Sequence, residues 1–166
     1  KKYRYLGFIF SIFSFYTVYK LYHLDNNQIN FLFILLICVS TDVGGYVFGK
    51  VFKGPKLTRI SPKKTYAGVI GGYVLTIISV NFLFQIQFFF PSKQEMNFSI
   101  LFLIILISTV SQLGDISISY FKRISNVKNT GKIIPGHGGL LDRVDGMIFS
   151  FPFYYVILLF NLSKEF

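Results

Sequence analysis

The chain is poor in charge, in cysteine and in tryptophan, and the first two scarcities restrict its class. Only 14% of its 166 residues are charged, whereas a soluble domain of this size carries about a quarter. The single Cys38 excludes an internal disulfide, and because it lies inside an apolar run we expect it to be a small buried hydrophobe. Tryptophan is absent while Phe, Ile, Tyr, Asn and Lys are abundant. We interpret this as a compositional bias and assign it no function.

Sequence repeats and low-complexity linkers are also absent, so we expect one membrane domain over residues 1–166. No small-residue cleavage site follows the first apolar stretch, so we expect no cleavable signal peptide. The chain has instead five apolar segments of roughly 17 to 23 residues, which at 1.5 Å per residue span most or all of a ~30 Å hydrocarbon core. The pattern predicts an all-α, polytopic membrane helix bundle. The segments are Tyr5–Leu21, Ile29–Phe48, Tyr66–Phe88, Phe98–Tyr120 and Gly146–Leu162.

The distribution of positive charge predicts the orientation of these segments. With a cytoplasmic N-terminus and five alternating helices, the inner side receives three cations before the first segment, six between residues 50 and 64 and five between residues 122 and 143. The outer side receives only Lys20, Lys93 and Lys164. Because Lys and Arg gather in cytoplasmic loops, we expect the N-terminus inside and the C-terminus outside. The net charge of +10 then suits anionic lipid head groups and nucleotides, and we expect no nucleic-acid partner.

The second segment carries a carboxylate inside an apolar run. Cys38, Asp42, Gly45 and Gly49 share one face at steps of four, three and four residues. A carboxylate at this depth costs about 2.5–3.5 kcal/mol on insertion scales, so we expect Asp42 to face the bundle or a wet cavity. The alternative is a structural pairing with a neighbouring helix.

The loop before the third segment is basic and ends in the sequence ISPKKT. Ser61 is a plausible N-cap with Pro62 at the first helical position. Lys63, Lys64 and Thr65 would then lie at a helix N-terminus, where backbone amides and the dipole favour an anion. A phosphate site is one interpretation, and ordinary cytoplasmic positive charge is the other.

The fourth segment has a polar stripe at helical spacing, with Ile and Leu on its other faces. A stripe that ends in a carboxylate and a lysine is expected to face a water-filled site. Interhelical hydrogen bonding is the alternative. The stripe consists of Ser108, Ser111, Gln112, Asp115, Ser119 and Lys122.

The stretch Ser119–Asp145, SYFKRISNVKNTGKIIPGHGGLLDRVD, has the highest concentration of residues that can bind phosphate or metal. It combines cations suited to phosphate, Gly138-Gly139 amides that can approach an anion, and carboxylates that can hold a hard metal ion. Asp142 could instead cap the last helix, with Asp145 in its first turn. The combination indicates phosphoryl or nucleotidyl transfer. Its charged residues are Lys122, Arg123, Lys128, Lys132, His137, Asp142, Arg143 and Asp145.

This stretch resembles the signature of the phosphatidate cytidylyltransferases, also called CDP-diacylglycerol synthases. Two other pieces agree: ISPKKTYAGVIGG resembles the family's ISPKKTWEG segment, and DVGGYVFGK resembles its D-x-x-A-Y-x-x-G-[KR] segment. The family is longer, so the chain resembles its C-terminal portion. Departures from the family pattern are Tyr66, Ala67, Ile118 and Asn129.

The resemblance implies a multi-pass enzyme of the inner (plasma) membrane with its site on the cytoplasmic side. It would join CTP and phosphatidic acid to give CDP-diacylglycerol and pyrophosphate with Mg²⁺, and a monovalent cation and a homodimer are left open. The resemblance implies a metal centre at Asp115 and Asp142, and Asp145 is a further metal candidate. The catalytic candidates are Asp115, Asp142, Lys122, Arg143 and His137. The phosphate and nucleotide contacts are Ser61, Lys63, Lys64, Thr65, Arg123, Gly138 and Gly139.

Three other functions remain open at this stage. An ion-coupled transporter would use Asp42 and Asp115 as coupling carboxylates, but it does not account for the basic, glycine-rich inner loop. A catalytically silent membrane subunit would be consistent with the departures from the family pattern. A different CTP-using lipid enzyme, such as a polyprenol kinase, is an alternative within the same class.

Overall fold

The computed structural model describes residues 2–24, 28–58, 61, 64–86, 96–125 and 144–160. They form five α-helices in the predicted order, and the only strand pairing among them is an isolated antiparallel bridge between Lys56 and Thr65. The all-α fold class is confirmed. The helices are α1 (Lys2–Leu24), α2 (Ile29–Phe52), α3 (Tyr66–Gln85), α4 (Phe98–Ile124) and α5 (Met147–Leu159).

The predicted helix starts at Ile29, Tyr66 and Phe98 are confirmed, but α2 and α4 continue four residues beyond their predicted ends. The apolar pattern stops where Lys50 and Lys122 begin the charged part of each segment. The backbone remains helical past that point, because a helix that leaves the apolar layer keeps its internal hydrogen bonds.

Three helices, α2, α3 and α4, are long and apolar enough to cross a membrane, which makes this a membrane protein. The other two predicted spans do not meet that standard within the described residues. α1 has 23 residues, but its tyrosines, serines and charged residues lower its hydropathy. α5 has 13 residues, or about 20 Å of helix, which is shorter than a ~30 Å hydrocarbon core.

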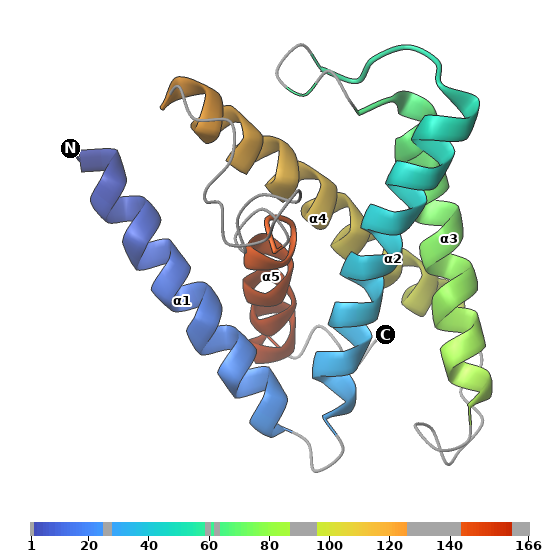
Figure 1. Ribbon diagram of the computed structural model, residues 1–166. Helices are drawn as coiled ribbons and strands as arrows, with labels where there is room; N and C mark the ends of the chain where they lie inside the picture. The colour runs from blue at the N-terminus through green and yellow to red at the C-terminus, as the bar shows by residue number, and fades with distance from the viewer. Residues whose placement is uncertain are drawn as a thin grey trace, which may run out of the picture.

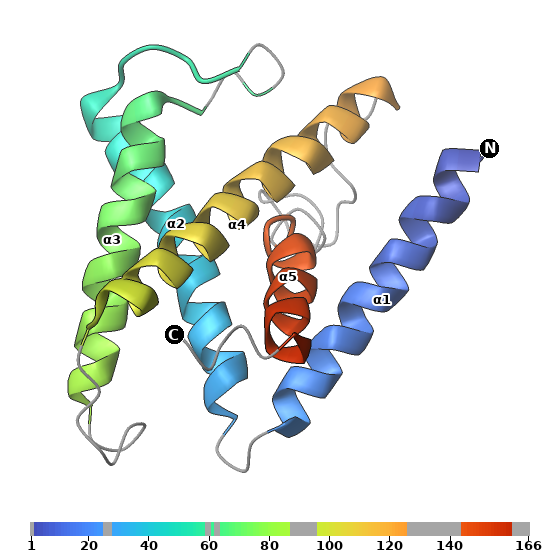
Figure 2. The same ribbon diagram turned by 180° about the vertical axis from the view of Figure 1, so that it is seen from behind.

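Glycines bring α2 and α3 into close contact along their length, and the two helices lie side by side in Figures 1 and 2. A Cβ added to Gly44 would lie 2.5 Å from the carbonyl oxygen of Gly71, and one added to Gly68 would lie 2.6 Å from that of Gly45. Small residues at these positions therefore let the two backbones touch.

The remaining helices enclose an apolar core. α5 packs against α1, α2 and α4, and lies between α1 and α2 in the view of Figure 1. Ile34, Ile37 and Cys38 of α2 are fully buried with Ile104 and Ile107 of α4, which confirms the prediction for Cys38. Large apolar side chains are also exposed on the outside of the bundle, as expected for a surface that contacts lipid.

Hydroxyl groups join three helices inside this core. Thr41 Oγ1 lies 3.0 Å from Thr76 Oγ1 and 2.9 Å from Ser108 Oγ, and it donates to the Ile37 carbonyl at 2.8 Å. None of the three hydroxyl residues is more than 2% exposed. Ser108, the first residue of the α4 polar stripe, therefore takes part in interhelical hydrogen bonding, which was the alternative interpretation.

Candidate active site

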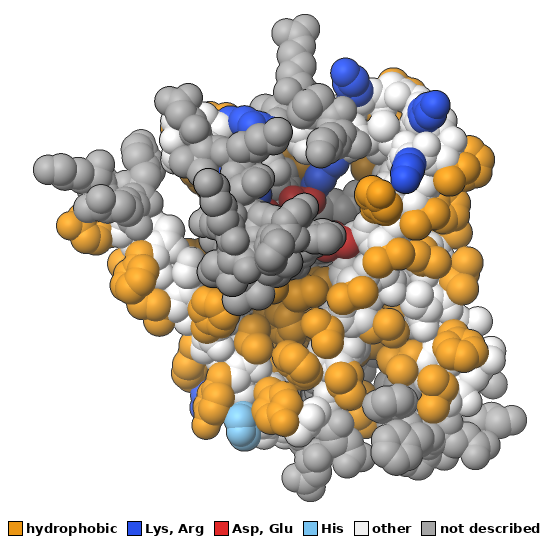
Figure 3. Space-filling view, in the orientation of Figure 1, with side chains coloured by type: hydrophobic (Ala, Val, Ile, Leu, Met, Phe, Trp, Pro, Cys, Tyr) orange, Lys and Arg blue, Asp and Glu red, His pale blue; other side chains and the backbone are white. Residues whose placement is uncertain are grey.

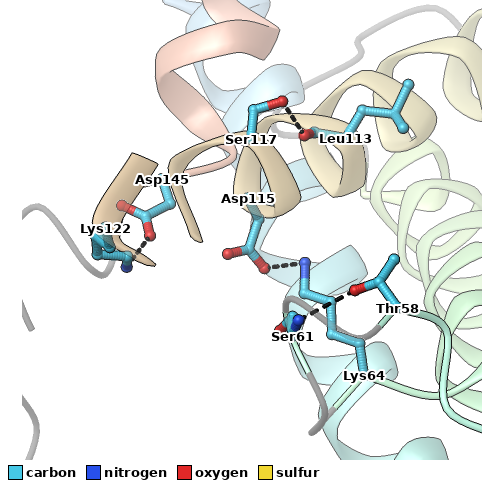
Figure 4. A network of polar contacts seen from close by, with 8 residues as sticks. All are labelled: Thr58, Ser61, Lys64, Leu113, Asp115, Ser117, Lys122 and Asp145. Atoms are coloured by element: carbon cyan, nitrogen blue, oxygen red, sulfur yellow. Dashed lines mark hydrogen bonds and ion pairs between the residues drawn. The ribbon is translucent and has the colours of Figure 1, made fainter. Parts of the chain in front are cut away.

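Charged side chains from four separate parts of the chain converge toward one end of the bundle. At this end α2 ends, α3 begins, α4 ends and α5 begins (Figure 1). Ion pairs and electrostatic interactions connect the side chains, and Figure 4 shows four of them. We call this set the charged cluster. It consists of Asp42 of α2, Lys64 before α3, Asp115 and Lys122 of α4, and Asp145 before α5.

The first ion pair joins Lys64 Nζ to Asp115 Oδ2. Both side chains keep access to solvent, with 25% of Lys64 and 31% of Asp115 exposed. Sequence reasoning placed the two residues in one site but did not foresee that they would pair with each other. An incoming ligand can reach either partner, because neither is enclosed.

The backbone around Lys64 is fixed by hydrogen bonds within the basic loop. The Lys64 carbonyl accepts from the Leu57 amide at 2.8 Å, and the Lys64 amide donates to the Ser61 carbonyl at 3.1 Å. The Tyr66 amide donates to the Pro55 carbonyl at 3.2 Å. The loop therefore holds the ammonium group of Lys64 toward α4, as Figure 4 shows.

The predicted cap of the third helix was wrong. α3 begins at Tyr66, and its N-cap is Thr65, whose hydroxyl accepts from the Gly68 amide at 3.1 Å. Ser61 lies four residues earlier, and its amide donates to Thr58 Oγ1. Thr65 itself is extended and pairs with Lys56, so the helix begins after it, later than the Ser-Pro pair suggested.

The second ion pair joins Lys122 Nζ to Asp145 Oδ2 at 2.9 Å. This pair is far less accessible than the first, with 16% of the Lys122 side chain and 6% of the Asp145 side chain exposed. It connects the last turn of α4 to the residues just before α5, across 23 positions of sequence.

Close packing holds the start of α5 against α4. A Cβ added to Gly146 would contact Ser111, with the Ser111 carbonyl oxygen 2.9 Å away. A Cβ added to Gly114 would lie 2.7 Å from the ring of Phe149. Asp145 is therefore placed next to α4 by backbone contact as well as by its lysine partner.

Asp42 completes the charged cluster from α2. Its carboxylate interacts electrostatically with Asp115, Lys64 and Asp145, although these residues lie far apart in the sequence. The residue is exposed rather than enclosed. Asp42 therefore lies near the other charged residues, and its expected position facing the bundle or a wet cavity stays a prediction.

Several predicted site residues are not placed in the charged cluster. Arg123 is exposed at the end of α4. Seen in Figure 3, most Lys and Arg side chains and the acidic side chains gather in the upper part of the molecule, and hydrophobic side chains cover the lower part. The predicted residues that lie outside the described part of the chain are Lys63, His137, Gly138, Gly139, Asp142 and Arg143.

Comparison with known proteins identifies the family. The profile described as "Cytidylyltransferase family" matches residues 2–161. The chain belongs to this family. It is 42% identical over 146 residues to a phosphatidate cytidylyltransferase of Rickettsia bellii, which covers 81% of the chain and 61% of that protein.

Two further relatives carry the same name. The protein of Rickettsia typhi is 35% identical over 161 residues, covering 93% of the chain and 69% of the relative. The protein of Bacillus subtilis is 37% identical over 138 residues, covering 82% of the chain and 50% of the relative. The chain thus spans about half to two thirds of the length of these cytidylyltransferases.

The carboxylate oxygens of the charged cluster suit one kind of metal ion. Within the described residues no group of three His, Cys, Asp or Glu side chains is arranged to hold a metal. Mg²⁺ does not need such a group, because it is usually bound through one or two carboxylates, several waters and the phosphates of its substrate. Asp115, which is partly exposed and near Asp42, fits that requirement.

Proposed function

We propose that the protein is a phosphatidate cytidylyltransferase that joins CTP to phosphatidic acid, giving CDP-diacylglycerol and pyrophosphate. The observation that carries the proposal is the meeting of Lys64 and Asp115 at one end of a membrane helix bundle of this family. A water-soluble nucleotide and a membrane lipid can meet only where a polar site adjoins the apolar layer.

The reaction forms a bond between a phosphate oxygen of phosphatidic acid and the α-phosphorus of CTP, and it breaks the bond from that phosphorus to the bridging oxygen of the β-phosphate. Pyrophosphate leaves with the electron pair. Because the attacking oxygen is already anionic, positioning and charge neutralisation supply most of the catalysis.

Lys64 has the clearest role among the described residues. Its ammonium group forms an ion pair with Asp115. When CTP binds, Lys64 exchanges this carboxylate for a phosphate oxygen and so offsets the charge of the triphosphate. Lys63, Arg123, Arg143 and His137 are further candidates for phosphate contacts.

Asp115 and Asp142 are the proposed ligands of Mg²⁺, and the carboxylate of Asp42 is within electrostatic range of Asp115. When bound, Mg²⁺ would neutralise phosphate oxygens of CTP. The carboxylate of Asp115 is released for this purpose when Lys64 turns to the triphosphate. Lys64 thus pairs either with Asp115 or with a phosphate of CTP, but not with both at once.

We place the site on the cytoplasmic side of the membrane. The start of α1, the end of α4 and the basic loop after α2 lie at the same end of the bundle in Figure 1. Lys50, Lys53, Lys56 and Lys64 are all at this end. That arrangement supports the orientation expected from the distribution of positive charge.

The test is synthesis of CDP-diacylglycerol by the protein in liposomes that contain phosphatidic acid. With CTP and Mg²⁺ we expect a lipid product that mass spectrometry identifies as CDP-diacylglycerol, together with one pyrophosphate per product. Liposomes given ATP, or CTP without phosphatidic acid, are the controls. A protein that gives no CTP-dependent product and whose thermal unfolding is unchanged by CTP would instead be a transporter or a silent subunit.

A further inference from the structure

One exposed face of α2 combines apolar side chains, a carboxylate and a lysine beside the charged cluster. We propose that phosphatidic acid reaches the site along this face, with its phosphate on Lys50 and its acyl chains along the valines. The inference deepens the proposed function and rests on it for the identity of the lipid. We call this surface the outer face of α2. It consists of the exposed residues Val39, Asp42, Val43, Tyr46, Val47 and Lys50.

Helix geometry places these residues on one side of α2. Their spacing of three and four positions follows the helical repeat. Gly44 faces the other way, and a Cβ added to it would lie 2.5 Å from the carbonyl oxygen of Gly71 on α3. The contact with α3 therefore leaves the outer face open, and the side chains of Val43 and Tyr46 are 47% and 67% exposed.

Lys50 lies in the last turn of α2 with its charge available to a ligand. Its ammonium nitrogen is 5.7 Å from the centre of the Tyr46 ring, which is within the range of a cation–π interaction. Among the described residues Lys50 forms no ion pair, in contrast to Lys64 and Lys122. An anionic lipid head group at the membrane surface is the natural partner for such a lysine.

The packing of α2 against the start of α3 brings Lys50 near the charged cluster. Gly49 precedes Lys50, and a Cβ added to Gly49 would lie 3.1 Å from Thr65 Oγ1, in the residue that follows Lys64. Lys64 extends toward α4, whereas Lys50 extends along the outer face toward Tyr46. The two lysines thus serve different directions, one toward the nucleotide and the other toward the bilayer.

Asp42 shows that the outer face is continuous with the charged cluster. It is exposed on this face, and its carboxylate interacts electrostatically with Asp115 and Lys64. A carboxylate surrounded only by hydrocarbon is unfavourable, so we expect water or a polar head group beside it. A lipid can therefore bring its phosphate to the cluster here while its chains remain in the bilayer along Val39 and Val43.

The dependence of the rate on the surface fraction of phosphatidic acid in liposomes tests the role of Lys50. Lys50→Gln should raise the KM for phosphatidic acid about tenfold, which is the loss expected for one charge-assisted contact. The KM for CTP and kcat at saturating lipid should not change, and Lys50→Arg should behave like the parent. Lys53→Gln is the matched control. It removes the same charge from an exposed lysine that follows the last residue of α2, and its KM for phosphatidic acid should equal that of the parent.

Three kinetic results would overturn the role of Lys50. An unchanged KM for phosphatidic acid in Lys50→Gln would show that the lysine does not contact the lipid. An equal rise in Lys53→Gln would show only a general attraction between positive charge and an anionic membrane. A rise confined to the KM for CTP would place Lys50 on the nucleotide instead.

Photolabelling tests the lipid path without catalysis. The probe is phosphatidic acid with a diazirine in one acyl chain, in phosphatidylcholine liposomes, and mass spectrometry locates the adducts. Labelling of Val39, Val43 and Val47 should exceed labelling of Ile70 and Ile78, which are more exposed and lie on α3. Excess unlabelled phosphatidic acid should abolish this difference, and phosphatidylglycerol should not. Equal labelling of the two helices, or equal competition by phosphatidylglycerol, would overturn the path.

The two experiments separate the lipid path from the proposed function. Selective labelling of α2 in a protein that makes no CDP-diacylglycerol would support the lipid site and overturn the proposed reaction. Synthesis of CDP-diacylglycerol with equal labelling of α2 and α3 would support the reaction and overturn the path.

Discussion

Lys64–Asp115 and Lys122–Asp145 are chemically the same pair in different surroundings. The first is about a quarter to a third exposed and joins a loop to the middle of α4. The second is almost enclosed and joins the end of α4 to the start of α5. An accessible ion pair contributes little to stability and can exchange its partners. An enclosed pair is costly to open, so it suits a permanent contact.

The comparison predicts its largest effect at Asp115. Asp115→Asn should lower the rate of CDP-diacylglycerol synthesis by more than about 100-fold, because it removes a proposed metal ligand. The Tm should change little, since the carboxylate is partly exposed. We expect the same loss for Asp142→Asn, at a residue outside the described part of the chain. Near-normal turnover in either variant would remove that residue from the mechanism.

A second prediction concerns a substitution that disturbs the α4–α5 packing beside the enclosed pair and leaves both charged side chains in place. Gly146→Ala should place a methyl group against Ser111 and push the start of α5 away from α4. Overpacking of this kind costs about 1–3 kcal/mol, which thermal unfolding would detect. Gly7→Ala is the control, because a Cβ at Gly7 has no neighbour within 4 Å. Equal Tm values for the two variants would contradict the tight α4–α5 contact.

A third prediction concerns the exchange of Lys64 between Asp115 and the triphosphate. Lys64→Met should reduce kcat/KM for CTP about tenfold, because it removes one charge-assisted contact of ~1.4 kcal/mol. Lys64→Arg should retain most of the activity. If Lys64→Met were as active as the parent protein, the pair with Asp115 would have no part in nucleotide binding.

The smallest effect is expected where α4 is polar but uncharged. Ser108→Ala removes one of the hydroxyls around Thr41, which keeps its bonds to Thr76 and to the Ile37 carbonyl. Hydrogen bonds between membrane helices are worth about 0.6 kcal/mol on average. We therefore expect a small loss of stability in an unfolding titration and unchanged CTP affinity. A change in CTP affinity would show that the hydroxyl group belongs to the site.

Much of the bundle was predictable because helix periodicity and apolar length are local properties. The starts of α2, α3 and α4 agree with the structure, and so does the burial of Cys38. The ends were less accurate, since charge stops an apolar run but does not stop a helix. The cap of α3 was missed because a bridge from Lys56 to Thr65 depends on a contact nine residues away.

The site was predictable as a set of residues but not as a set of partners. Spacing placed Asp115 and Lys122 on one face of α4, and the structure agrees. Nothing in that spacing indicated that Asp115 would pair with Lys64 and Lys122 with Asp145. A possible signal was the balance of charge, because three acids and two lysines in one cluster must neutralise one another in part.

The sequence by itself determined that this is a helical membrane protein of the cytidylyltransferase family. The length of the apolar segments, the distribution of charge and the spacing of the motifs are local properties that do not depend on tertiary contacts. Only the tertiary structure decided which carboxylate is open to a ligand and which is enclosed with a lysine. That choice depends on how closely α4 and α5 pack at Gly146, and such a contact exists only after distant segments have folded together.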